Sequence, residues 1–185
     1  KRKNLPPPPP PPTQILKLSI ESNKKMDKRP KLEIKLTNTD KAIELIGFLI
    51  LITFWVIIIV SYNNLPEQIP IHYNGLGEVD NYSKKSSIFL LPIIGSFLFI
   101  ILTLISKNPE SFNYNVKITE QNAESQYRNS VNMMRIMKII VIVIFFLIDF
   151  KTIKTSLGKS EGLGIWFLPM TLGIIFIPII YFAYK

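Results

Sequence analysis

The sequence predicts an all-α integral membrane protein with four transmembrane helices and a small cytoplasmic two-stranded β ribbon. Four long apolar runs predict the helices, and two short stretches of alternating polar and apolar residues predict the ribbon. The chain is 48% hydrophobic, yet its formal net charge is +9. The basic residues are concentrated in the first 41 positions, and the apolar runs occupy the rest of the chain. The net charge therefore does not indicate a nucleic-acid binder, and we expect the lipid bilayer as partner and no nucleic acid.

The four runs place the spans at about residues 43–62, 87–106, 133–155 and 163–184. A bilayer core about 30 Å thick needs roughly 20 helical residues to cross it. The first two runs are free of charge over most of their length, and the third has an apolar centre between Lys138 and Asp149. A soluble helix bundle is the alternative, but its helices would need polar faces that these runs lack.

Lysine and arginine are distributed unequally about the spans. Of the 22 basic residues, 17 lie before the first span, between the second and third spans, or at the C-terminal end, and five lie in the other two loops. Cytoplasmic loops are enriched in Lys and Arg. We therefore expect both termini in the cytoplasm.

Residues 1–25 differ in composition from the rest of the chain. A basic patch is followed by seven prolines, which favour an extended polyproline helix and cannot pack a core. We expect a disordered tail, with the four-span membrane domain at residues 26–185. Met26 begins a segment that reads like a natural start, so we expect the tail to be non-native; a ligand for a proline-binding domain is the alternative.

Two segments next to the spans have the pattern of strands. Residues 31–36 read KLEIKL and residues 112–118 read FNYNVKI, so polar and apolar side chains alternate. Both lie on the predicted cytoplasmic side, one before the first span and one after the second. We expect them to pair as the β ribbon.

Local signals predict where helices begin and end. Thr37 and Asp40 have the spacing of a capping box, which predicts the start of the first helix. The third helix is predicted to begin near Glu120, outside the membrane, and to end at Gly158. Three glycines inside the spans are predicted to let helices approach closely: Gly47, Gly95 and Gly173.

The connection between the first two spans, residues 65–86, favours a rigid shape. Pro66 and Pro70 restrict the backbone, and Gly75 and Gly77 permit the positive φ angles of a reversal. Short polar side chains cluster around that reversal. We predict a ligand-recognition loop with these residues: Pro66, Pro70, His72, Asn74, Gly77, Asp80 and Lys85.

His72 is the only histidine, and three roles are open to it. It can fix the reversal by hydrogen-bonding the backbone or a carboxylate, it can sense acidity, or it can bind a metal with nearby carboxylates. One histidine with carboxylates is a weak ligand set, so we expect no metal site. Asp80 is expected to cap the turn, and Lys84 and Lys85 to mark the membrane boundary; a recognition pair of Asp80 and Lys85 is the alternative.

Asp149 is a candidate intramembrane polar site. A charge at the bilayer centre costs about 2.5–3.5 kcal/mol on insertion scales, so such residues often belong to a transport pathway. Asp149 lies near the outer end of its span, beside Lys151 and Lys154. This favours a satisfied boundary residue that touches the 65–86 loop over a transport site.

The residue inventory argues against an enzyme. The sequence has no cysteine and one histidine, which excludes thiol catalysis, disulfides and a multi-histidine metal site within this chain. It also has no HExxH motif, phosphate loop or dinucleotide fingerprint. We expect neither catalytic residues nor a cofactor.

The loop fits the pattern L-P-x-x-I-P-x-H-x-N-x-x-G-x-x-D, followed by an aromatic residue and a lysine. The matching residues are Leu65, Pro66, Ile69, Pro70, His72, Asn74, Gly77, Asp80, Tyr82 and Lys85. The pattern resembles domain of unknown function 1648, the N-terminal membrane domain of SdpI-type immunity proteins, and the chain as a whole resembles its short stand-alone members. The resemblance implies the bacterial cytoplasmic (inner) membrane, and toxic-peptide immunity or envelope stress as the context.

Three functions are open on this basis. The leading hypothesis is a non-enzymatic multi-pass membrane protein whose external loop binds or senses a ligand, with a peptide toxin or a membrane protein as partner. The first alternative is a small proton- or ion-linked transporter, or its accessory subunit, in which Asp149 and His72 handle the ion. The second is a structural partner within a larger membrane complex.

Overall fold

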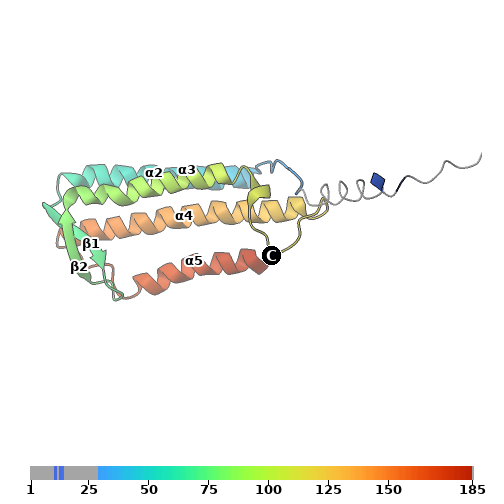
Figure 1. Cartoon of the computed structure of the whole chain (residues 1–185). Helices are drawn as coiled ribbons and strands as arrows, with labels where there is room; N and C mark the ends of the chain where they lie inside the picture. Colours follow the sequence, from blue (N-terminus) through green and yellow to red (C-terminus); the bar gives the residue numbers. More distant parts are fainter. Residues whose placement is uncertain (1–10, 12, 15–28, 185) are drawn as a thin grey trace, which may run out of the picture.

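Figure 1 shows a computed structural model of the chain, which describes residues 11, 13–14 and 29–184. Among these residues, four helices are long and apolar enough to cross a bilayer, and a two-stranded antiparallel sheet is present. The predicted fold class is therefore confirmed. The elements are α2 (Asn38–Tyr62), β1 (Gln68–Tyr73), β2 (Val79–Lys84), the 3₁₀ turn η1 (Lys85–Phe89), α3 (Leu90–Ile105), the 3₁₀ turn η2 (Pro109–Ser111), α4 (Ala123–Ser156) and α5 (Phe167–Tyr184).

Helix α4 lies at the centre of the bundle. It contacts α2, α3 and α5, and α5 lies on the opposite side of α4 from α2 and α3 (Figure 1). Many apolar side chains of α2, α3 and α5 point outward, among them Val60, Phe97 and Ile177. An apolar surface on this scale requires lipid as the surrounding solvent. The chain is therefore a multi-pass membrane protein.

Two of the three predicted packing glycines let helices approach α4 closely. A Cβ on Gly47 would come within 2.9 Å of Ile139 Cγ1, and one on Gly95 within 3.0 Å of Ile142 Cδ1. Both glycines are buried, so a side chain at either position would push α2 or α3 away from α4. The prediction for Gly173 is wrong, because within the described residues a Cβ there would meet only Ile177 of its own helix, at 4.0 Å.

The predicted helix ends are confirmed. The Asp40 amide donates to Thr37 Oγ1 at 3.1 Å, and the Thr37 amide donates to Asp40 Oδ2 at 2.8 Å, which is a complete capping box. Helix α4 begins at Ala123 and runs unbroken to Ser156. Gly158 follows with φ of +69°, the left-handed conformation that commonly ends a helix.

The two-stranded sheet lies elsewhere than predicted. Strands β1 and β2 pair within the loop between α2 and α3, whereas residues 31–36 and 112–118 form no strand. The predicted location of the ribbon, next to the N-terminal tail, is therefore wrong.

Side chains take the place of strand pairing in those two segments. Arg29 donates to the carbonyl groups of Glu110 and Phe112, and the Tyr127 hydroxyl donates to the carbonyl of Pro30 at 2.9 Å. Ile34 packs against a small core centred on Tyr127, to which residue 118 also belongs. Leu32 and Leu36 of the first segment and Val116 of the second are exposed, so the period of two in the sequence marks neither a strand nor a continuous buried face.

The expectation of a non-native, disordered tail concerns residues 1–25, and it lies outside the described residues apart from positions 11, 13 and 14. The described membrane domain begins at residue 29.

Candidate functional site

Residues 68–84 form a β hairpin at one end of the bundle, which we call the hairpin end (Figure 1). The opposite end, where α2 begins and α5 finishes, is the terminal end. Gln68 lies opposite Lys84 at the open end of the hairpin, and Tyr73 lies opposite Val79 near its turn. Two register shifts between these pairs leave Ile71 on β1 and Asp80 on β2 without a partner. Such bulges re-aim side chains and are common beside functional sites.

Asn74 builds the turn of the hairpin. Its Oδ1 accepts from the amides of Leu76 and Glu78 at 2.9 and 3.1 Å, and its Nδ2 donates to Glu78 Oε2 at 2.8 Å. This is the turn-forming role that we predicted for Asp80, so that prediction is wrong. An asparagine at the first turn position can bond the backbone two residues on, which Asp80 on β2 is too far along the chain to do.

The tip of the hairpin rests on the loop between α4 and α5 through backbone contacts. The Gly77 carbonyl accepts from the Leu163 amide at 2.8 Å, and Glu78 forms a β bridge with Gly162. Gly77 has φ of +78°, and a Cβ there would lie 2.5 Å from the Gly164 carbonyl oxygen. Only glycine meets both demands. Gly75, in contrast, has open space around it and no positive φ.

Two polar side-chain contacts lie on the exposed parts of the hairpin. His72 Nδ1 lies 2.6 Å from Asp80 Oδ1, so the expected bond between His72 and a carboxylate is present. Lys85 Nζ donates to Glu67 Oε1 at 2.9 Å and lies 5.5 Å from the centre of the Tyr62 ring. Lys85 therefore closes the base of the hairpin and does not pair with Asp80.

The inner face of the hairpin continues the membrane core. Ile69 of β1 is buried in one cluster with Phe54 and Ile58 of α2, Ile88 of η1 and Ile153 of α4. The burial of this face removes apolar surface from solvent, at about 25 cal/mol per Å². The hairpin is thus packed as part of the fold, with its position set by α2 and α4.

One polar contact joins the hairpin to α4. The Tyr73 hydroxyl lies 2.7 Å from Thr152 Oγ1. Burial raises the pKa of the Tyr73 phenol above its ordinary value of 10.0. The phenol therefore stays neutral and able to donate throughout the physiological pH range.

Asp149 lies one helical turn before Thr152 and also faces the hairpin. Its side chain is among the few buried polar groups, with the residue 4% exposed, and among the described residues no partner hydrogen-bonds its Oδ2. It borders a cavity of about 420 Å³ between the hairpin and α4, which Pro70, His72 and Tyr73 also line. Asp149 thus lines the same cavity as the loop, which leaves its predicted contact with the loop a prediction, and the expectation that its carboxyl is satisfied is wrong for Oδ2.

The structure separates the seven predicted loop residues into groups. Pro70 and His72 border the cavity together with Asp149. Asn74 and Gly77 form the turn and its contact with the α4–α5 loop. Asp80 lies within hydrogen-bonding distance of His72. Pro66 and Lys85 lie at the base of the hairpin, away from the cavity. Tyr73 and Thr152, which complete the polar edge of the cavity, were not predicted.

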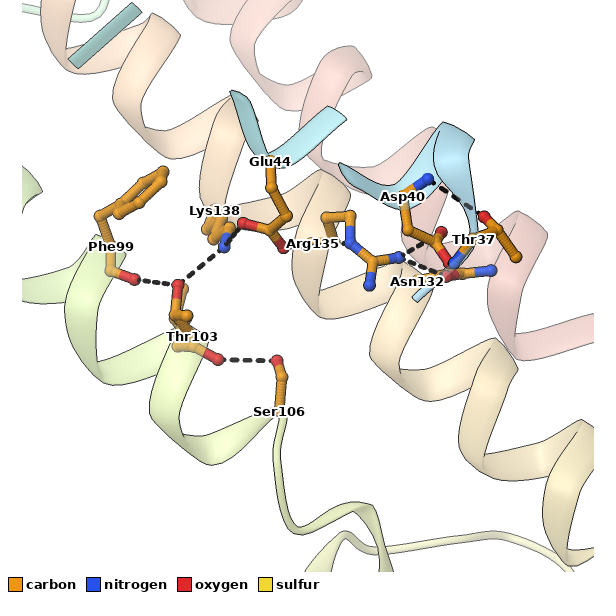
Figure 2. Close-up of polar contacts among 10 residues, drawn as sticks. Thr37, Asp40, Glu44, Phe99, Thr103, Ser106, Asn132, Arg135 and Lys138 are labelled. Atoms are coloured by element: carbon orange, nitrogen blue, oxygen red, sulfur yellow. Dashed lines mark hydrogen bonds and ion pairs between the residues drawn. The ribbon is translucent and has the colours of Figure 1, made fainter. Parts of the chain in front are cut away.

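A second polar cluster lies inside the bundle toward the terminal end, and Figure 2 shows how its side chains meet. Arg135 of α4 is 3% exposed; its Nε donates to Glu44 Oε1 at 3.0 Å and its Nη1 to Asp40 Oδ1 at 2.8 Å. Lys138 is 2% exposed; its Nζ donates to Glu44 Oε2 at 2.5 Å and to Thr103 Oγ1 at 2.7 Å. We call Asp40, Glu44, Arg135 and Lys138 the ionic cluster.

The ionic cluster joins three helices and is electrically balanced. Its carboxylates come from α2, its two cations from α4, and Thr103 adds α3 (Figure 2). Lys138 also lies 4.5 Å from the centre of the Phe99 ring. In a low-dielectric environment, removing one member of such a set leaves an uncompensated charge. The cluster therefore holds α2, α3 and α4 in one arrangement.

The sequence contains a signal for this cluster that we did not use. Asp40 and Glu44 are spaced i, i+4, and Arg135 and Lys138 are spaced i, i+3, so each pair occupies one helix face. The signs of the two faces are opposite. One helix thus has an acidic face and another has a basic face, each at the edge of a membrane span. This pattern predicts that the two helices pack with these faces together.

Comparison with known proteins gives two matches. A family model described as a domain of unknown function (DUF1648) matches residues 48–95, from α2 through the hairpin into α3. An uncharacterized protein of Archaeoglobus fulgidus is 29% identical over 72 residues, a stretch that covers 39% of this chain and 39% of that relative. The match thus spans less than half of the relative's length. No solved structure matches the chain.

Proposed function

We propose that this multi-pass membrane protein, which carries a domain of unknown function 1648 at residues 48–95, binds a ligand between its hairpin and α4. The proposed ligand is an amphipathic cation of peptide origin. It acts by binding and not by catalysis. The hairpin faces the outside of a bacterial cytoplasmic membrane, and both termini face the cytoplasm.

The buried Asp149 carboxyl is the observation that supports this proposal most strongly. Its Oδ2 has no partner in the described part of the chain, and the residue borders a cavity large enough for a ligand group. A buried polar atom without a partner costs about 1–3 kcal/mol, so its retention calls for an explanation. A ligand that donates a hydrogen bond to Oδ2 supplies one.

The remaining cavity walls describe the rest of the ligand. Beyond its polar edge the cavity is lined mainly by apolar side chains, among them Ile69, Leu91 and Ile148. A pocket of this volume holds one or two side chains and not a whole peptide. The ligand therefore combines an apolar surface with an amine or guanidinium group, as a cationic amphipathic peptide does.

Binding of a defined probe tests the proposal. A fluorescein-labelled amphipathic helix of Lys and Leu is titrated onto the protein in nanodiscs of neutral lipid, and the anisotropy is measured. Asp149→Asn should weaken binding at least about tenfold, because a charge-assisted hydrogen bond contributes about 1.5–3 kcal/mol. Glu161→Gln is the matched control, since it removes an exposed carboxyl from the same end without touching the cavity. Equal affinity of Asp149→Asn and wild type would reject the proposal.

The resemblance to SdpI-type proteins supplies the biological setting to test. Combined replacement of His72, Asn74 and Asp80 should abolish protection of cells against a toxic peptide while the amount of protein in the membrane stays normal. Retained protection would reject the role of the hairpin in immunity. If neither this variant nor Asp149→Asn changes the protection of cells, the result favours the hypothesis that the protein is a structural partner within a larger membrane complex.

The proposed sidedness has its own test, because the chain has no cysteine. Lys84→Cys places a thiol on β2 and Lys117→Cys places one in the loop between α3 and α4; both positions are exposed. A membrane-impermeant maleimide should label Cys at position 84 in intact cells, and at position 117 only after lysis. The reverse pattern would invert the topology.

A proton- or ion-linked transporter is the second candidate, and the same Asp149 oxygen favours it. Ionisable groups within membrane helices often belong to a transport pathway. Under this hypothesis Asp149→Asn stops ion flux into vesicles that contain the reconstituted protein and a pH-sensitive dye. Unchanged flux would reject transport and leave the binding proposal standing.

A further inference from the structure

A second cavity at the hairpin end lies between α4 and α5, and Leu163 lines both this cavity and the one beside the hairpin. Its volume is about 440 Å³. Its apolar walls are formed by Leu147 and Phe150 of α4, Leu163 of the α4–α5 loop, and Phe167 and Met170 at the start of α5. The cavity is thus a groove between two membrane helices, and its apolar part runs along both of them.

Three lysines gather at one end of this groove. Lys151 Nζ donates to Ser160 Oγ at 3.2 Å, Lys154 Nζ lies 4.8 Å from the centre of the Phe150 ring, and Lys159 is exposed. None of the three pairs with a carboxylate within the part of the chain that the structure describes, whereas the cations of the ionic cluster do. The groove therefore has a concentrated and uncompensated positive charge.

The residues around the groove are also of the kinds that occur where a membrane helix meets the lipid headgroups. Lys154 is in the last turn of α4, and Trp166, which borders the groove and is 79% exposed, precedes α5. Tryptophan is enriched at the level of lipid headgroups, and lysines clustered near a membrane surface attract anionic headgroups electrostatically. Two features of the groove, its charge and the kinds of residues around it, thus point to the same kind of occupant.

We propose that the groove between α4 and α5 binds one anionic phospholipid, with the phosphate among Lys151, Lys154 and Lys159 and an acyl chain along the apolar walls. A soluble anion satisfies the lysines but leaves the apolar walls uncovered. A neutral lipid covers the walls but leaves three charges without a counterion. An anionic phospholipid satisfies both, and its binding does not depend on the function proposed for the hairpin.

The two tryptophans of the chain allow a direct test. In a Trp55→Phe background, Trp166 at the groove is the only remaining tryptophan. The protein is placed in phosphatidylcholine nanodiscs, and a rising fraction of brominated phosphatidylglycerol is compared with the same fraction of brominated phosphatidylcholine. We expect the anionic lipid to quench Trp166 at a fraction at least about tenfold lower, because each lysine near the headgroup adds to the preference.

Matched variants separate a site from general charge. Changing Lys151, Lys154 and Lys159 together to Gln should make the two brominated lipids quench alike. Changing Lys84, Lys107 and Lys117 to Gln removes the same charge from exposed positions elsewhere and should leave the preference intact. Equal quenching in the parent protein, or equal loss in both triple variants, would overturn the proposal. So would displacement by millimolar glycerol phosphate, which would assign the lysines to a soluble anion.

Discussion

The two ends of α4 hold buried ionisable groups in opposite ways. Toward the terminal end, every member of the ionic cluster has a partner of opposite sign within hydrogen-bonding distance. At the hairpin end, Asp149 is equally buried, yet its Oδ2 has no partner among the described residues. Lys138 and Asp149 are 11 residues apart, about three helical turns, so the contrast lies within one helix.

This difference in pairing distinguishes residues that stabilise the fold from residues that are available for binding. Charged groups that hydrogen-bond one another hold helices together and have no free donor or acceptor for a ligand. A polar group that is buried without a partner lowers the stability of the protein. The trade-off between stability and activity leads us to expect such a group where it is needed for ligand binding. The contrast predicts opposite effects of mutation at the two ends.

The largest effect is expected in the ionic cluster. Glu44→Ala leaves Arg135 and Lys138 buried with only Asp40 to compensate them, and should destabilise the protein by about 3–5 kcal/mol. Equilibrium unfolding in mixed micelles measures the loss. The control is Glu124→Ala, which breaks an exposed i, i+4 pair with Arg128 and should cost no more than about 0.5 kcal/mol. Similar losses for the two variants would contradict the structural role of the cluster.

The contact between the hairpin tip and the α4–α5 loop should give the next largest effect. Gly77→Ala forces a residue with a Cβ into a left-handed conformation, at about 1–2 kcal/mol, and adds a clash with the Gly164 backbone. Hydrogen exchange should show faster opening of the hairpin and of residues 157–166. Gly75→Ala is the matched control and should exchange like wild type, because the space around Gly75 is open.

Asp149→Leu should change stability in the opposite direction. It replaces a buried carboxyl that lacks a partner with an apolar group, and we expect a gain of about 1–3 kcal/mol in the free energy of unfolding. The same variant should lose binding of the amphipathic peptide. A destabilised Asp149→Leu would mean that the carboxyl is satisfied, and would remove the contrast between the two ends.

The smallest effect is expected at the contact between Tyr73 and Thr152. Tyr73→Phe removes one hydrogen bond and should destabilise the protein by about 0.5–1.5 kcal/mol at neutral pH. Burial raises the pKa of the folded phenol above 10.0, so the stability that this tyrosine contributes is complete below pH 10 and is lost as the pH rises further. The difference in melting temperature between wild type and Tyr73→Phe should therefore narrow from pH 8 to pH 11. A constant difference would contradict this role of the phenol.

Features encoded locally could be predicted from the sequence. The four helices follow from uninterrupted apolar runs, the start of α2 from the spacing of Thr37 and Asp40, and the end of α4 from Gly158. Each depends on residues within one segment. The bond between His72 and Asp80 also spans only eight residues, and a rigid loop with one histidine and several carboxylates suggested it.

Features that join distant segments could not be predicted. The period of two at residues 31–36 and 112–118 did not distinguish a strand from an irregular segment in which only some apolar side chains, such as Ile34 and Ile118, pack near α4. Gly77, Gly162 and Gly164 meet across more than 80 residues through backbone atoms, which leave no side-chain pattern to read. The paired charges of the ionic cluster lie over 90 residues apart, and their spacing marks a face on each helix without naming its partner.

The backbone hydrogen bond between Gly77 and Leu163 joins the hairpin to the loop that leads into α5. Helix α5 touches the rest of the bundle chiefly through α4, but the start of the helix is also tied, through Leu163, to a hairpin whose base is anchored on α2. The hairpin and the loop that leads into α5 are therefore attached to each other at one end of the bundle. The backbone bond gives α5 a second point of attachment to the fold, in addition to its packing on α4.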